Sequence, residues 1–358
     1  MPSFYDIANI IQNWLNETFS PTWSLIFQMV IAGVCVIGLF ATLGLVLVLM
    51  ERRVAAWMQI RLGPNRVGPK GMLQSLADTL KLLVKEGFTP DGADKFLFNL
   101  APFIAMIVAM LLMAPIAFAK DFQLWNLNIG VLYISAVSSI MVISILMAGW
   151  ASNNKYSLMG AMRSGAQIVS YELSAGLSIL TIVVLTGSLN ITDIINAQAD
   201  GWWIFKGHIP VLISFVIFII AVTAETNRAP FDLAEAESEL TAGFHTEYSG
   251  MKFALFFLAE YINVFIVCAL GAILFLGGWM PFHIGHWEAF NQVMDYIPSS
   301  IWFFGKTFFL IFVIMWFRWT FPRLRIDQLL HLEWKYLLPI SMFNLLLVTA
   351  IAILGWYF

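Results

Sequence analysis

Long apolar segments alternate with shorter polar ones along most of the chain. Eight of these segments approach the length of about 20 residues that an α-helix needs to cross a bilayer. The pattern therefore predicts an all-α polytopic membrane protein with eight transmembrane helices. We place the spans at 24–50, 96–119, 129–150, 166–187, 209–224, 253–278, 301–317 and 336–357.

The composition agrees with a membrane protein and excludes several other classes. Of the 358 residues, 60% are hydrophobic and 11% are charged, against about 45–50% and about 25% in soluble domains. A soluble globule, a disordered chain and a nucleic-acid-binding protein are thereby excluded. No fixed-period repeat and no Pro/Gly/Ser-rich linker divides the sequence, so we expect one membrane domain over residues 1–358.

The basic residues are unevenly distributed among the loops and predict an orientation. Alternate loops hold 16 of the 19 Lys and Arg residues, the exceptions being Lys120, Lys206 and Lys306. Lys306 lies near the end of the seventh span, where a long side chain can reach the interface. Loops rich in Lys and Arg stay on the cytoplasmic side of the membrane. The basic loops follow the first, third, fifth and seventh spans, so both termini should be outside. The loops predicted to be cytoplasmic are 51–95, 151–165, 225–252 and 318–335.

The first cytoplasmic loop has features of a structured segment. Residues 73–86 carry apolar side chains on one helical face and charged ones on the other. Fourteen residues are too few to span a bilayer, so we expect an amphipathic helix at the membrane surface. The preceding stretch 61–71 contains two Gly-Pro breaks and predicts a fixed turn.

Three carboxylates lie where the bilayer disfavours charge. Glu172, Glu225 and Glu260 all fall toward the cytoplasmic side of their spans, and an ionisable group at the centre costs about 2.5–3.5 kcal/mol or more. Glu260 would lie roughly 12 Å deep. Each alone could be a structural hydrogen bond between helices. Together they favour a polar path that enters from the cytoplasm.

The loop after the fifth span is unusually acidic. Five carboxylates occur within fifteen residues beside a single Arg228, and Glu247 follows shortly. A solvated loop is the usual interpretation of such a run, but interleaved Ala, Pro and Phe favour partial burial. Crowded, partly desolvated carboxylates bind protons more tightly, as proton transfer near neutral pH requires. The five are Glu225, Asp232, Glu235, Glu237 and Glu239.

Catalytic motifs and metal-ligand patterns are absent from the sequence. It has no nucleotide-binding Gly loop or nucleophile elbow, and its two isolated cysteines, Cys35 and Cys268, predict no metal or cluster site. Three interpretations remain: a membrane subunit that couples proton movement to a reaction held by partners, a secondary ion transporter, and a structural anchor. The large cytoplasmic loops with fixed turns favour the first.

Four groups of residues form a recognisable set in this order along the chain. They are Glu51–Arg53 with Met58–Pro69, Ala77–Asp78 with Lys85–Glu86, Glu225–Glu239, and Phe321–Leu329 with Trp334–Lys335. Together they resemble the family of the H subunit of respiratory complex I, called subunit 1 in mitochondria. The resemblance implies a membrane subunit of proton-pumping NADH:quinone oxidoreductase, in the bacterial inner membrane rather than the mitochondrial one. It further implies that the subunit forms the membrane part of the quinone chamber.

Cofactors and partners are implied by the same resemblance. The chain itself should bind no covalent cofactor, while a quinone (ubiquinone or menaquinone) would be the substrate. NADH, FMN and iron–sulfur clusters would belong to partner subunits. Partners would be the quinone-site subunits of the hydrophilic arm, small neighbouring membrane subunits and lipid, with no nucleic acid.

Residue roles also follow from the resemblance. The residues expected to line or brace the quinone chamber are Glu51, Arg52, Arg61, Asp78, Arg228 and Asp232. Those expected to couple protons are Glu172, Glu225, Glu235, Glu237, Glu239, Glu247 and Glu260. The alternative is the homologous subunit of a membrane-bound hydrogenase or formate-hydrogen lyase, which needs no quinone. Retention of the 61–69 and 225–239 signatures favours the quinone enzyme.

Overall fold

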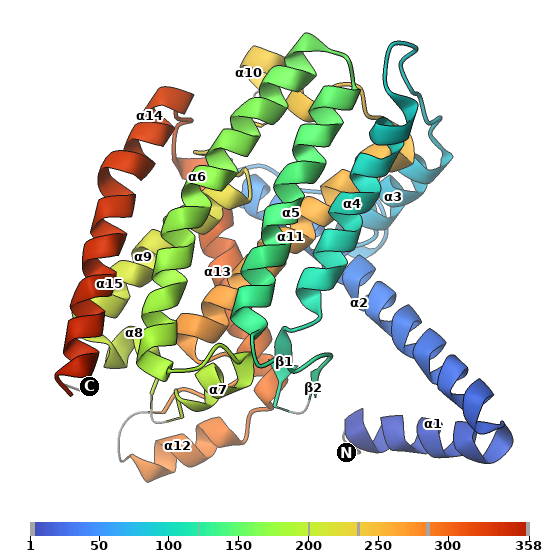
Figure 1. Cartoon of the computed structure of the whole chain (residues 1–358). Coiled ribbons are helices and arrows are strands. Elements are labelled where there is room, and N and C mark those ends of the chain that lie inside the picture. The colour runs from blue at the N-terminus through green and yellow to red at the C-terminus, as the bar shows by residue number, and fades with distance from the viewer. Residues whose placement is uncertain (1–3, 121, 200, 235–236, 284–286, 356–358) are drawn as a thin grey trace.

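The protein is a bundle of long helices that run roughly side by side (Figure 1). The computed structural model describes residues 4–120, 122–199, 201–234, 237–283 and 287–355. Within these ranges eight helical segments are long and apolar enough to cross a membrane, which confirms the all-helical architecture and the number of apolar helices. The eight are α2 (Pro21–Met58), α4 (Lys95–Met113), α5 (Gly130–Ala151), α6 (Lys155–Thr186), α9 (His208–Glu225), α11 (Gly250–Leu276), α13 (Ser299–Thr320) and the C-terminal segment Ile326–Ile353.

Shorter elements connect or flank these helices. The C-terminal segment consists of α14 (Ile326–Leu332), a π-helical turn (Glu333–Leu337) and α15 (Leu338–Ile353). One small antiparallel hairpin, β1 (Ala117–Ala119) with β2 (Phe122–Gln123), departs from the all-α expectation. The others are α1 (Phe4–Thr18), α3 (Gln74–Val84), α7 (Ile191–Asn196), α8 (Trp203–Lys206), α10 (Glu237–Leu240), α12 (Glu288–Asp295) and the 3-10 turns Pro69–Gly71 and Gly243–His245.

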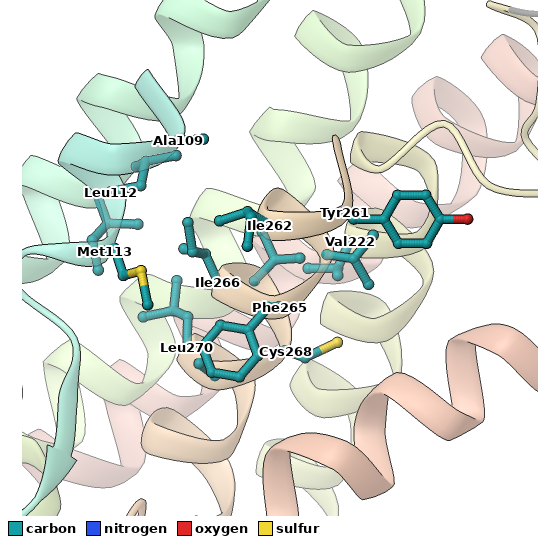
Figure 2. Close-up of a cluster of buried hydrophobic side chains, with 14 of the residues drawn as sticks. Ala109, Leu112, Met113, Val222, Tyr261, Ile262, Phe265, Ile266, Cys268 and Leu270 are labelled. Carbon is teal, nitrogen blue, oxygen red and sulfur yellow. The ribbon is translucent and has the colours of Figure 1, made fainter. Parts of the chain in front are cut away.

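Helix α11 forms the centre of the bundle. Its side chains are buried on nearly all sides from Tyr261 onward, as expected for a helix that is apolar all round. Figure 2 shows Phe265 and Ile266 among Leu112 of α4 and Val222 of α9. Truncation of a fully buried phenylalanine costs about 3–5 kcal/mol. This packing fixes α11, and with it the carboxylate Glu260.

Helix α2 packs into the core of the bundle through its second half. Its first half points away from the bundle together with α1 (Figure 1), and Met29 and Val34 there are each 64% exposed. Farther along, Phe40 and Leu47 are fully buried. Glu51 lies near the end of this buried second half of α2.

The amphipathic segment of the first loop is helical, as predicted. Helix α3 lies within the expected range 73–86, and its Leu76, Leu80 and Val84 side chains are exposed. An exposed apolar face of this kind suits the membrane interface.

Several helices extend beyond the spans predicted from hydropathy. Helix α6 begins at Lys155 rather than 166, after Asn154 caps it by accepting a hydrogen bond from the Tyr156 amide. The C-terminal segment begins at Ile326 rather than 336. Apolar windows detect only the part of a helix with few polar residues, so they assign the first turns of these two helices, about three in each, to loops.

Lys306 is buried within the protein, whereas the sequence predicted a side chain that extends to the interface. It is only 7% exposed, and its Nζ donates to the carbonyl oxygens of Leu276 (2.6 Å), Gly278 (2.9 Å) and Met280 (2.6 Å). Leu276 is the last residue of α11 and the other two carbonyls follow it; at a helix end partners are missing and a cation is favourable. Lys306 therefore caps α11.

Candidate functional site

A buried cluster of charged residues lies where α2, α9, α11 and α13 meet. Its centre is Arg228, which follows the end of α9 and is 5% exposed. One guanidinium nitrogen of Arg228 donates to both carboxylate oxygens of Glu51, at 2.8 and 3.0 Å. The Nε of Arg228 lies 3.5 Å from Glu260 Oε1. The Tyr261 ring packs against the guanidinium, with 4.4 Å between Cζ and the ring centroid.

A second arginine completes this cluster. Arg318, near the end of α13, donates to Oε1 of Glu51, an oxygen that also accepts from Arg228. Glu51 is therefore held between two arginines although it is only 6% exposed. Two arginines and two glutamates balance in formal charge, which is the arrangement that buried charges require. Removal of one partner from a buried pair costs about 3–5 kcal/mol.

The turn after α9 is held in place by α6. The side-chain amide of Gln167, which is fully buried, donates to the carbonyl oxygens of Ala224 and Phe231, each at 2.7 Å. These two carbonyls lie on either side of Arg228. Burial alone would lower the pKa of Arg228, but the charges of Glu51, Tyr261 and Glu260 raise it well above its ordinary value. Arg228 therefore stays charged.

A cavity of about 410 Å³ opens beside this cluster. It brings together three of the expected chamber residues, Glu51, Arg52 and Arg61. Asp78 joins them indirectly, because it forms an ion pair with Arg52. The remaining lining residues are Ala55, Ala56, Leu62, Gly63, Pro64, Tyr261 and Trp319.

A second, mostly apolar cavity lies deeper in the bundle and contains two of the predicted carboxylates. Glu172 of α6 and Glu225 of α9 both line this space of about 40 Å³, together with Ser138 and Asn263. Ser139 on α5 donates a hydrogen bond to Glu172. A cavity this size with several polar groups can hold a few water molecules, and water can carry a proton between carboxylates.

Comparison with known proteins decides the family. Residues 30–349 match the NADH dehydrogenase family. The chain is 57% identical over 354 residues to the H subunit of NADH-quinone oxidoreductase from Bacteroides thetaiotaomicron, an alignment that covers 98% of this chain and 99% of the relative. The corresponding protein of Bacteroides fragilis is 56% identical with the same coverage, and that of Brevibacillus brevis is 47% identical over 93% and 95%.

This chain belongs to the H-subunit family of NADH-quinone oxidoreductase. It is therefore a membrane subunit of a multisubunit enzyme, and the resemblance inferred from the sequence motifs is confirmed. Its bacterial relatives and its eight apolar helices agree with a multi-pass membrane protein. No group of three or more His, Cys, Asp or Glu side chains that could hold a metal occurs among the described residues.

The other predicted carboxylates of this NADH-quinone oxidoreductase subunit lie apart from the two cavities. Arg163 donates to Glu239 at 2.6 Å, and this hydrogen bond lowers the pKa of the exposed Glu239 carboxyl. Glu247 accepts from the Asn154 side chain at 2.6 Å. Both contacts attach the acidic loop to the first part of α6. Asp232 is half-buried in that loop.

Two further predictions fall where the structure gives no side-chain description. Glu235 lies outside the described residues, and Glu237 is described only as the first residue of α10. The proposed coupling role of the loop stays a prediction for both.

Sequence reasoning missed several polar residues of this membrane subunit, four of which show why. In the sequence, Arg318 is only a topology signal, and Tyr261 and Ser139 look like ordinary span residues. Glu333 falls in a predicted loop, although it is fully buried and accepts a hydrogen bond from Ser174. A continuous helical pattern from 326 to 353 would have placed Glu333 inside a span.

Proposed function

We propose that this chain forms the membrane part of the quinone chamber and couples quinone reduction to proton translocation across the bacterial inner membrane. One observation carries the proposal. Glu51 lines the 410 Å³ cavity and is bound by Arg228, which also reaches the intramembrane carboxylate Glu260. One ion-pair network thus links a cavity large enough for a quinone ring to the carboxylates of the bundle.

The chemistry of quinones explains why such a network is useful. Reduction of a quinone consumes two electrons and two protons, and the electrons would come from clusters in partner subunits. An unbalanced charge in a poorly hydrated chamber is expensive because Coulomb interactions are strong there. A change in the charge beside Glu51 would alter how Arg228 divides its attraction between Glu51 and Glu260. A change of charge in the chamber can therefore alter the electrostatic environment of Glu260 inside the membrane.

Helix α11 supports the next step of this coupling. Glu260 and Asn263 are three residues apart and lie on one face of the helix. Asn263 lines the cavity shared by Glu172 and Glu225, and its side-chain amide oxygen Oδ1 has no hydrogen-bond partner among the described residues. Water in this cavity would connect the carboxylates. We therefore order the path as Glu51, Arg228, Glu260, then the Glu225 and Glu172 pair.

The first cytoplasmic turn offers a docking place for partner subunits of the hydrophilic arm. Ile60 is 96% exposed and Leu62 is 90% exposed beside the cavity, and exposed apolar side chains at such a place mark an interaction surface. The turn is closely packed, because Gly71 has φ +74 and a Cβ there would lie 2.1 Å from the Pro64 oxygen, so only glycine fits at this position. A partner that covers this turn would close the chamber.

A matched pair of variants tests the chamber. Arg61 lines the cavity and Arg66 belongs to the same turn but does not. In the assembled complex, Arg61→Ala should lower quinone reductase activity several-fold, while Arg66→Ala should not. NADH oxidation by an artificial acceptor that bypasses quinone should stay normal in both variants. Equal quinone reductase activity in the two would contradict the proposal.

A photoreactive quinone gives a second, direct test. A quinone that carries its photoreactive group on the ring should crosslink within residues 51–64 or at Trp319, and excess unlabelled quinone should suppress the crosslink. Crosslinks confined to other parts of the chain would place the chamber elsewhere.

A further inference from the structure

Glu333 is a buried carboxylate outside both cavities described above. It opens the π-helical turn between α14 and α15 and is fully buried. Ser174 of α6 donates to its Oε1, while its Oε2 has no hydrogen-bond partner among the described residues. A buried carboxylate with one oxygen unsatisfied is costly when charged, and a membrane protein that retains one usually uses it.

This carboxylate is separate from the Glu172–Glu225 site. Successive residues of an α-helix turn by about 100°, so Ser174 and Tyr171 lie on the opposite face of α6 from Gly176 and Glu172. Glu172 and Gly176 line the inner cavity. Tyr171 and Ser174 face the C-terminal segment, where Tyr171 also donates to the Leu329 carbonyl oxygen at 3.1 Å.

A line of buried polar groups continues from Glu333 into the membrane. The Ser178 hydroxyl donates to the Ser174 carbonyl at 2.9 Å, and the Thr181 hydroxyl donates to Ser214 on α9 at 2.9 Å. The Asn344 side chain of α15 donates to the same Ser214 hydroxyl at 2.7 Å. Asn344 lies eleven residues after Glu333, or roughly 16 Å along the helix. The line therefore extends about halfway through a hydrocarbon core of about 30 Å.

The π-helical turn places Glu333 beside exposed positions. Trp334 is 55% exposed and its indole N–H donates to Ser170 at 3.4 Å. Tyr171 faces Glu333 from α6, whereas His331 and Lys335 of its own segment are exposed. π-helical turns within α-helices are frequent at functional sites. A proton from the predicted cytoplasmic side would therefore have a short distance to travel.

We propose that Glu333, held by Ser174, is a further proton-binding carboxylate of this membrane subunit, separate from the Glu172–Glu225 site, and exchanges its proton with water at the π-helical turn. In this exchange, the carboxylate takes a proton from hydronium and leaves water, and the reverse step returns it. The ligand is a proton, and the line of hydroxyls below stabilises the polar site within the bundle. A role in turnover would rest on the function proposed above, but proton binding itself does not.

Infrared difference spectroscopy of the intact complex in membranes tests this proposal without any turnover. Spectra recorded between two pH values should contain the carbonyl stretch of a protonated carboxyl group that Glu333→Gln removes. Glu17→Gln, at an exposed carboxylate near the N-terminus, should leave that band unchanged. Identical bands in the wild type and Glu333→Gln would overturn the proposal.

Two further readouts keep the test decisive if Glu333→Gln does not assemble. Ser174→Ala removes the hydrogen bond but keeps the carboxylate, so the band should shift in frequency rather than disappear. Transfer to heavy water should shift the wild-type band as the proton exchanges. A band whose frequency changes neither in Ser174→Ala nor in heavy water would contradict the proposal and assign Glu333 a structural role. Because no quinone is involved, these results stand independently of the Arg61 comparison.

Discussion

Glu51 on α2 and Arg228 after α9 form a buried ion pair across 177 positions of sequence. The pair fastens the cavity-lining end of α2 to the turn that α6 holds through Gln167. The two partners are 5% and 6% exposed, so a charge left without its partner would remain largely shielded from water. A double-mutant cycle on Glu51 and Arg228 can therefore measure the interaction energy between them.

The first prediction concerns this pair. Arg228→Gln should destabilise the subunit by about 3–5 kcal/mol, because it leaves Glu51 with Arg318 alone. Glu51→Gln in the same chain should recover part of that loss, so the two effects should be far from additive. Thermal unfolding of the detergent-solubilised complex gives the readout. Strict additivity would mean that the two side chains do not interact.

The second prediction concerns the intramembrane carboxylates. Glu225→Gln and Glu260→Gln should lower turnover and proton pumping several-fold while the complex still assembles. Glutamine keeps the volume and the hydrogen-bonding end but cannot ionise. Pumping in reconstituted vesicles is the measurement, with the exposed Glu288→Gln as the matched control. Normal pumping in both buried variants would assign them a structural role.

The third prediction concerns pH. His245 is 4% exposed, and burial lowers its pKa from 6.5 to about 3. The unfolded segment therefore binds more protons than the folded one between these values, and stability falls as the pH drops below about 6.5. The limiting slope is about 1.4 kcal/mol per pH unit.

Hydrogen exchange of residues 243–249 measures this effect. Protection should decrease between pH 6.5 and 4.5 in the wild type and much less in His245→Phe. The exposed His331→Phe should behave as the wild type does. An equal loss of protection in all three would show that another group titrates.

The fourth prediction concerns the cap on α11. Lys306→Met removes the donor that three carbonyl oxygens share, two of them buried and one half-buried. Each buried one left unsatisfied costs about 1–3 kcal/mol. The melting temperature of the complex should fall, with faster exchange at the end of α11. Lys120→Met, at an exposed lysine on the same predicted side, should change neither. A stable Lys306→Met variant would show that water replaces the ammonium group.

The fifth prediction concerns orientation. In a variant without Cys35 and Cys268, an impermeant thiol reagent should label Lys70→Cys only from the cytoplasmic side. Lys120→Cys should be labelled only from the outside. Labelling of position 70 from the outside would reverse the assigned topology.

Local sequence signals are sufficient for the fold but not for the charged cluster. Each span can be located from its own apolar residues, and the carboxylates Glu172, Glu225 and Glu260 stand out because the bilayer disfavours them. The pairing of Arg318 with Glu51 joins positions 267 apart, and no local pattern reports such a distance. Glu333 escapes detection for another reason, since its helix begins in a polar turn that hydropathy assigns to a loop.

Helix α6 contacts three separate sites of the subunit. Gln167 holds the turn around Arg228, Glu172 lines the inner cavity, and Ser174 binds Glu333. The three positions lie within eight residues, so they move as one rigid body. A small roll of α6 about its own axis would then alter all three acidic sites at once. Motion of a single helix would be enough to synchronise them, with no chain of separate conformational steps.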